Sequence, residues 1–239
     1  MTQNTLTQLL NRTMPLLGKA AIAMWWTIAP ELKGEFEDWH SHEHFPERMA
    51  IPGFNRGSRW ADAAGGTGYF VLYELDHYET LTSPAYRARL DSPTPWSTRM
   101  MPHHQAMVRS QCRMLGSFGG GVPRVLTTLR CAAAAGREAG LTAWLVGSAL
   151  PPLVALPGIT GAHLLQTQTP QGLPMTTEQK IRGGDAAADL IVVLGGYSSA
   201  ALAAVTQREL NADALQARGA SGPVLENAFA LSYARSAGD

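Results

Sequence analysis

Apolar and polar positions along the chain fall into short runs that predict alternating strands and helices. In the first half, strand-like runs rich in aliphatic and aromatic residues occupy Ala20–Ile28, Arg56–Trp60, Tyr69–Leu75 and Val108–Phe118. A helix is expected after Phe36, and a second one over Tyr78–Leu90. The order is therefore strand, helix, strand, strand, helix, strand.

The second half repeats this order. Its expected strands are Arg124–Cys131, Ala162–Gln166, Asp189–Gly195 and Glu226–Arg235, and its second helix is expected over Ser198–Ala217. Each half then has the strand and helix order of a ferredoxin-like unit.

The two halves also match residue by residue. The segment 36–54, FEDWHSHEHFPERMAIPGF, aligns without a gap with 141–159, LTAWLVGSALPPLVALPGI, at an offset of 105. Trp39 falls on Trp144, Pro46 on Pro151, and Pro52-Gly53 on Pro157-Gly158. The third strands of the two copies, Tyr69–Leu75 and Asp189–Gly195, pair at an offset of 120, which leaves 15 extra residues in the second copy, around Thr167–Ala188. We infer an internal duplication.

A single ferredoxin-like unit leaves one face of its sheet uncovered, and an apolar face needs a partner. Two tandem units can cover each other, so the sequence predicts an α+β protein of two βαββαβ units that form an intramolecular α+β barrel. The expected division is an N-terminal extension over 1–17, a first unit over 18–118, a Gly-rich linker over 119–123 and a second unit over 124–239.

Composition narrows the class of protein. Lys plus Arg equals Asp plus Glu at 19 each, which argues against binding nucleic acid or a membrane surface by bulk charge. With 45% hydrophobic and only 16% charged residues, the chain has an ample core and is expected to hide surface in an interface, internal or in a homodimer. The apolar segment Leu141–Leu165 is broken by prolines and glycines, so we expect no membrane span. The absence of an export signal and the two cysteines, expected as free thiols, favour the cytoplasm.

A polar cluster distinguishes the first copy from the second. The second copy keeps the tryptophan and prolines of the helix but has apolar or small residues, or proline, at the positions equivalent to His40, His42, Glu43, His44, Glu47 and Arg48. The polar side chains are therefore not needed to build the helix, and serve either solvation or chemistry.

Helix geometry sorts the cluster. His40 and His44 are four residues apart and share a face, whereas His42 points elsewhere. Pro46 removes a backbone donor and is expected to bend or end the helix near His44. An imidazole titrates near neutral pH, and Glu43 or Glu47 could orient it and favour its charged form. A solvent-facing helix, a pocket and a metal site remain open; His40-x-x-Glu43-His44 matches the inverted zinc-protease signature, which Pro46 weakens.

Further residues on the expected strands and loops could face the same cavity. Trp39 lies on the helix, Arg59, Trp60 and Tyr73 lie on strands, and His103 lies before the last strand of the first unit. Alternation along a strand places Trp25 and Trp26 on opposite faces, so only one of them can point into the cavity.

The motif Asp38-Trp39-His40-Ser41-His42-Glu43-His44-Phe45-Pro46-Glu47-Arg48, followed by Ile51-Pro52-Gly53-Phe54 and Gly57-Ser58-Arg59-Trp60, resembles the dimeric α+β barrel superfamily, especially EthD-like proteins. The resemblance implies the barrel fold. The superfamily includes cofactor-free monooxygenases, muconolactone isomerases, polyketide cyclases and haem-degrading enzymes, so it implies a reaction only weakly. EthD-like proteins usually pair two short chains, from which this tandem form departs.

The first functional hypothesis is a small-molecule enzyme that needs no cofactor: an oxygenase, isomerase, cyclase or lyase acting on a hydrophobic or aromatic substrate. His40 or His44 would be the general acid or base, held by Glu43 or Glu47, and Arg48 or Arg59 would stabilise an oxyanion. The alternatives are a non-catalytic protein that binds a hydrophobic metabolite, a haem-binding or haem-degrading protein with a histidine ligand, and a structural oligomerisation module.

Overall fold

The computed structural model describes residues 16–168, 174–182 and 185–239. Its strands are β1 (Ala20–Thr27), β2 (Phe54–Asp62), β3 (Gly68–Leu75), β4 (Gln105–Gly119), β5 (Val125–Ala133), β6 (Ile159–Thr167), β7 (Leu190–Gly196) and β8 (Ala220–Ser236). Its α-helices are α2 (Lys33–Trp39), α3 (Phe45–Met49), α4 (Pro84–Asp91), α5 (Pro95–Met100), α6 (Glu138–Trp144), α7 (Thr177–Arg182), α8 (Ser199–Arg208) and α9 (Ala212–Ala217).

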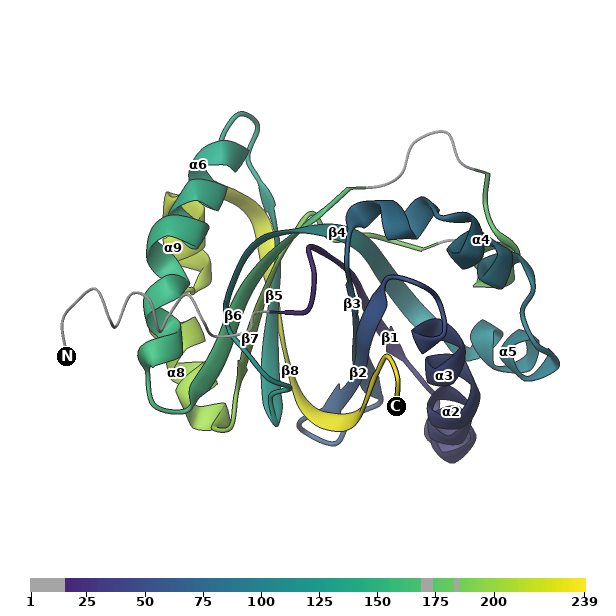
Figure 1. Ribbon diagram of the computed structural model, residues 1–239. Coiled ribbons are helices and arrows are strands. Elements are labelled where there is room, and N and C mark those ends of the chain that lie inside the picture. The colour runs from purple at the N-terminus through teal and green to yellow at the C-terminus, as the bar shows by residue number, and fades with distance from the viewer. Residues whose placement is uncertain (1–15, 169–173, 183–184) are drawn as a thin grey trace.

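The strands form one closed antiparallel barrel in the order β1-β3-β2-β8-β5-β7-β6-β4. Each unit contributes four neighbouring strands, and the units are joined where β2 pairs with β8 and where β4 pairs with β6. Helices α2 to α5 cover the outside of the first unit's sheet, and α6, α8 and α9 cover that of the second unit, on opposite sides of the barrel (Figure 1). The expected tandem α+β barrel is therefore confirmed.

Three apolar layers follow from strand alternation. One lies between the first sheet and its helices, one lies between the second sheet and its helices, and the third fills the barrel. Trp26 belongs to the first layer and Trp25 to the barrel interior, which confirms that neighbouring tryptophans point to opposite faces.

The duplication is visible in backbone detail. The chain between β1 and β2 contains a π-helical turn, His40–His44, in which the Phe45 N–H donates to the His40 carbonyl. The second unit has its own π-helical turn, Leu145–Ala149, 105 residues later. The two Pro-Gly turns also match, with Gly53 at φ +89° and Gly158 at φ +93°, a conformation that favours glycine.

Pro46 was expected to bend or end the first helix near His44, and the helix does not end there. It continues from α2 through the π-helical turn into α3, with Pro46 in the first turn of α3, a position that proline tolerates. The expected helix over Tyr78–Leu90 is also divided, into a 3-10 turn, Tyr78–Thr82, and α4. The expected helix over Ser198–Ala217 is divided into α8 and α9.

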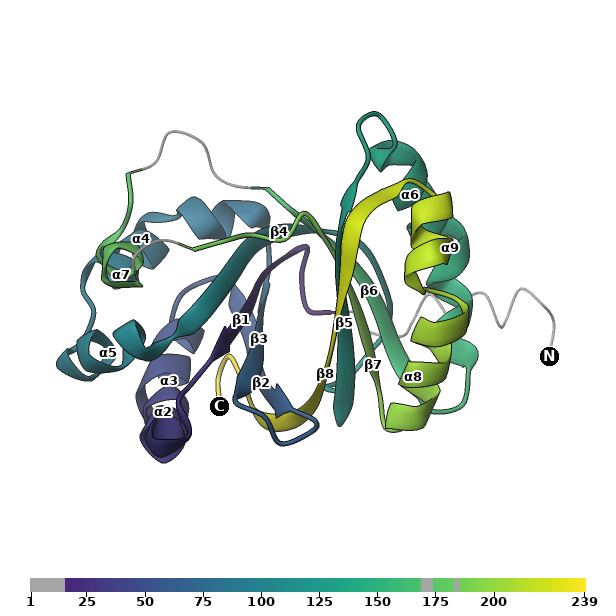
Figure 2. The ribbon, with the colours of Figure 1, turned by 180° about the vertical axis from the view of Figure 1, so that it is seen from behind.

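The extra segment of the second unit contains α7. Although α7 follows β6 in the chain, it lies beside α4 among the helices of the first unit (Figure 2). Cys112 and Cys131 are buried free thiols. Within the described part of the chain, no helix is both long enough and apolar enough to cross a membrane.

Candidate functional site

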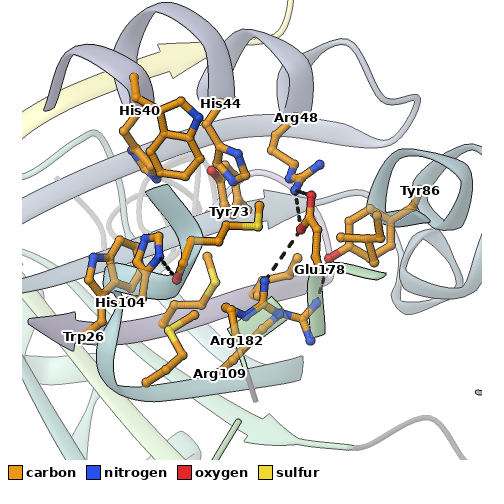
Figure 3. A pocket seen from close by; sticks show the side chains of 16 residues that line it. Trp26, His40, His44, Arg48, Tyr73, Tyr86, His104, Arg109, Glu178 and Arg182 are labelled. Atoms are coloured by element: carbon orange, nitrogen blue, oxygen red, sulfur yellow. Dashed lines mark hydrogen bonds and ion pairs between the residues drawn. The ribbon is translucent and has the colours of Figure 1, made fainter. Parts of the chain in front are cut away.

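A small cavity of about 40 Å³ lies between the outer face of the β1–β3 sheet and the helices of the first unit. Its wall contains His40, His44 and Arg48 from the helix, Tyr73 from β3, and Trp26 from β1 (Figure 3). The rest of the wall is Ile22, Met24, Trp39, Tyr86, Leu90, Met101, His104, Met107, Arg109, Glu178 and Arg182. The space is sufficient for two or three water molecules.

The two histidines lie side by side, as their spacing predicted. Their ring centroids are 5.3 Å apart, and only 2% of His40 and 8% of His44 is exposed. Aromatic rings surround them. The distance between ring centroids is 4.5 Å for Phe45 and His40, and 4.6 Å for Trp39 and His44. His42, on the same turn, is exposed.

Burial makes both imidazoles neutral. Loss of water lowers the pKa of His40 and of His44 well below 6.5, and the Arg48 guanidinium lowers both further. The Nδ1 atoms of both rings are buried and have no hydrogen-bond partner among the described residues. At neutral pH each ring is therefore uncharged. Its Nδ1 can accept or donate a hydrogen bond according to the tautomer, and the lowered pKa makes the ring a weaker base than a free imidazole.

The glutamates do not hold the histidine rings, contrary to the sequence-based hypothesis. Glu43 Oε1 accepts hydrogen bonds from the indole of Trp39 at 3.1 Å and from the hydroxyls of Thr94 at 2.5 Å and Ser97 at 3.3 Å. Glu47 pairs with Arg89 at 3.2 Å. Both carboxylates face polar partners outside the cavity, since an ionised carboxylate facing apolar rings would lose its hydration without compensation.

Arg59 and Trp60 also lie outside this cavity. Arg59 faces the helix, where it donates to the Glu37 carbonyl at 3.3 Å and to Ser41 Oγ at 3.2 Å. Trp60 is the next residue on β2 and so points the other way, into the barrel, where its indole donates to the Pro123 carbonyl. The sequence-based hypothesis that both face one cavity was wrong for that reason.

Tyr73 and Trp39 line the cavity, but His103 does not. Its neighbour His104 does, and packs edge-on against Trp26 with ring centroids 4.8 Å apart. Burial of the His104 ring excludes water from it, and this lowers the pKa of His104 to about 4. The Tyr73 hydroxyl has no partner among the described residues, and burial raises its pKa, so it stays protonated.

Sequence reasoning missed the charged end of the cavity. Arg48 is buried and bonds through Nη2 to both carboxylate oxygens of Glu178, at 2.5 and 2.7 Å. Arg109 comes from β4 and donates to the Tyr86 hydroxyl at 2.7 Å, while Arg182 lies on α7. Glu178 is 130 residues from Arg48, so the only available signal was the extra length of the second copy.

The described residues contain no group of three His, Cys, Asp or Glu side chains arranged to hold a metal ion. No protein-family model matches the sequence. No curated protein matches it either.

Solved structures of similar shape exist. An anthrone oxidase-like protein superposes with a TM-score of 0.59 at 16% identity, covering 95% of this chain and 97% of its own. A candidate monooxygenase from Fusobacterium nucleatum has a TM-score of 0.59 at 5% identity, covering 92% and 95%. A haem-binding protein from Thermus thermophilus has a TM-score of 0.50 at 11% identity, with the same coverage.

The chain shares the α+β barrel fold of these proteins. At these identities the likeness concerns the fold alone. In this α+β barrel both units lie in one chain, and the polar cavity belongs to the first unit's helical layer.

Proposed function

We propose that this α+β barrel protein is an enzyme that moves a proton on a small hydrophobic molecule bound between the first sheet and its helices. One observation supports this most directly. Five residues that line the same cavity have a buried side-chain atom without a partner among the described residues: His40 Nδ1, His44 Nδ1, Tyr73 Oη, Arg48 Nη1 and Trp26 Nε1. Buried polar groups are normally paired, so such a set is suited to a polar guest.

The roles follow from protonation. A neutral imidazole of His40 or His44 accepts the proton from an acidic O–H or C–H of the substrate, and the imidazolium so formed returns a proton to another atom of the same molecule. The Tyr73 hydroxyl donates a hydrogen bond to the oxygen on which negative charge develops. Arg48, at the charged end, favours that charge through its positive field. These steps use only the side chains of the chain itself.

Size restricts the substrate. A cavity of about 150 Å³ holds a benzene-sized ring, and the volume of this cavity is about 40 Å³. Met24, Met101 and Met107 line it, and their unbranched side chains can change rotamer to admit a single ring.

A haem is a much larger guest. Pockets for drug-sized ligands run from roughly 300 to 1,000 Å³, so this cavity does not fit a haem. The haem alternative is checked by absorbance near the Soret region, where we expect no band.

The test is a turnover assay with a defined panel of single-ring phenols and unsaturated lactones, with deuterium uptake from D2O and product formation followed by mass spectrometry. His40→Gln and His44→Gln replace the ring with a polar side chain that cannot take the proton. His42→Gln is the matched control on the exposed side of the same turn.

We expect a loss of about 10²–10⁴ in rate for one or both cavity variants and an unchanged rate for the control. Wild-type rates in all three variants would refute the proposal. Ligand binding that depends on His40 and His44, with no turnover of any panel member, would instead favour the non-catalytic binding protein.

A further inference from the structure

The cavity of the first unit is closed by a piece of the second. Helix α7, Thr177–Arg182, belongs to the extra segment that the first copy lacks. It brings Glu178 and Arg182 into the wall of the cavity, opposite the helix that carries Arg48 (Figure 3). Glu178 is only 3% exposed.

Polar side chains help to hold α7 against the first unit. Glu178 of α7 forms a buried ion pair with Arg48. At the solvent-exposed start of α7, the Thr177 N–H donates to Asp91 Oδ1 at 2.9 Å. The apolar contribution to the first unit's core is Ile181, which is only partly buried. A buried ion pair gives little net stability once its desolvation is counted, so an anion that replaces Glu178 on Arg48 can release the helix.

The charges at this end leave a place for such an anion. Arg48, Arg109 and Arg182 line the cavity with Glu178 as the one carboxylate among its wall residues, and Arg182 also pairs with Asp185 at 3.0 Å. Both Glu178 oxygens bind the same nitrogen of Arg48, and Arg48 Nη1 is buried without a partner among the described residues. Arg48 thus keeps an unused donor for a second acceptor, and a guanidinium suits a carboxylate in two-point contact.

We propose that the substrate is a hydrophobic carboxylate, and that Glu178 occupies the position its carboxylate takes. Binding then exchanges one carboxylate for another on Arg48 and undocks α7, which adds to the space that the methionine rotamers open for a ring. This inference rests on the proposed function, which identifies the cavity as the substrate site. In it, Glu178 of the second unit competes with the substrate for Arg48 of the first unit.

The experiment compares benzoate with its neutral analogue benzamide, using calorimetry on the full chain. Glu178→Gln removes the competing charge. Glu47→Gln is the matched control, because Glu47 also pairs with an arginine, Arg89, but outside the cavity. We expect Glu178→Gln to tighten benzoate binding by about tenfold and to leave benzamide binding unchanged, while the control binds both as the wild type does.

The wild-type protein gives a second measurement, should Glu178→Gln fold poorly. Saturating benzoate should speed amide hydrogen exchange over residues 176–182, and benzamide should not. Equal benzoate affinity in wild type and Glu178→Gln, or exchange that is unchanged or slowed by benzoate, overturns the proposal. Neither readout needs proton transfer, so they can succeed where the turnover test of His40 and His44 fails, and the reverse also holds.

Discussion

Replacing His104 with glutamine should change how the stability of the protein depends on pH. The His104 ring lies against Trp26, and its Nδ1 is 3.0 Å from the Met101 carbonyl oxygen. Burial outweighs that contact and the charge of Asp185, and it lowers the pKa of the ring from 6.5 to about 4. On unfolding, the ring regains its ordinary pKa. Below pH 6.5, His104 therefore binds a proton in the unfolded chain but stays neutral in the folded protein. The free energy of unfolding consequently falls as the pH falls.

The size of the effect follows from the shift. A fall in pKa from 6.5 to about 4 corresponds to about 3 kcal/mol, lost between pH 6.5 and pH 4. By pH 5 about 2 kcal/mol of this is gone, because the unfolded ring is then mostly charged while the folded ring is mostly neutral. With a urea m-value of about 3 kcal/mol per M, this corresponds to a midpoint shift of roughly 0.7 M.

Urea unfolding followed by tryptophan fluorescence at pH 7.5 and at pH 5 measures this difference. The wild type should lose about 2 kcal/mol more than His104→Gln over this range, whatever the variant loses at both pH values through packing. His42→Gln, at an exposed position, should parallel the wild type. Parallel pH dependence for wild type and His104→Gln would show that the ring is hydrated and would refute the reasoning.

Three further outcomes are expected. Gly57→Ala should destabilise the protein by about 1–3 kcal/mol, because its Cβ would lie 2.3 Å from the ring of Phe45; Gly34→Ala, where a Cβ meets nothing within 4 Å, is the control in thermal unfolding, and equal midpoints would contradict the packing. Arg59→Met should lower the unfolding midpoint yet leave benzoate affinity within about twofold, since Arg59 lies outside the cavity and its bonds tie the helix to β2; a large loss of affinity would mean that it reaches the ligand. The thiols of Cys112 and Cys131, whose pKa values burial raises to about 12 and about 11, should react with a disulfide reagent at pH 8 only after urea unfolding, and rapid labelling of the folded protein would count against their burial.

The fold could be predicted because its determinants are local and occur twice. The Pro-Gly turns and the matched tryptophans mark equivalent backbone positions, and strand alternation places Trp25 and Trp26 correctly without knowledge of the neighbours. The pairing of His40 with His44 follows from helical spacing alone.

The remainder of the site depends on tertiary placement. His103 ends a 3-10 turn and His104 follows it, just before β4, so the geometry of that turn decides which of the two faces the cavity, and no periodic pattern in the sequence reports it. Glu178 comes from the other unit, and no local pattern links it to Arg48. The glutamates beside the histidines were misassigned because spacing shows which residues are near each other in the helix, but not whether α5 offers a better hydrogen-bond donor.

The exchange of strand pairing between the units bears on how the protein is made. Arg56 of β2 lies opposite Ser236 of β8, so the edge of β2 stays unpaired until nearly all of the later sequence has left the ribosome. An unpaired edge invites association with other chains, and pairings so far apart in sequence form slowly. A nascent first unit is therefore a natural client for a chaperone, and a chain truncated before β8 should aggregate rather than persist as a folded half.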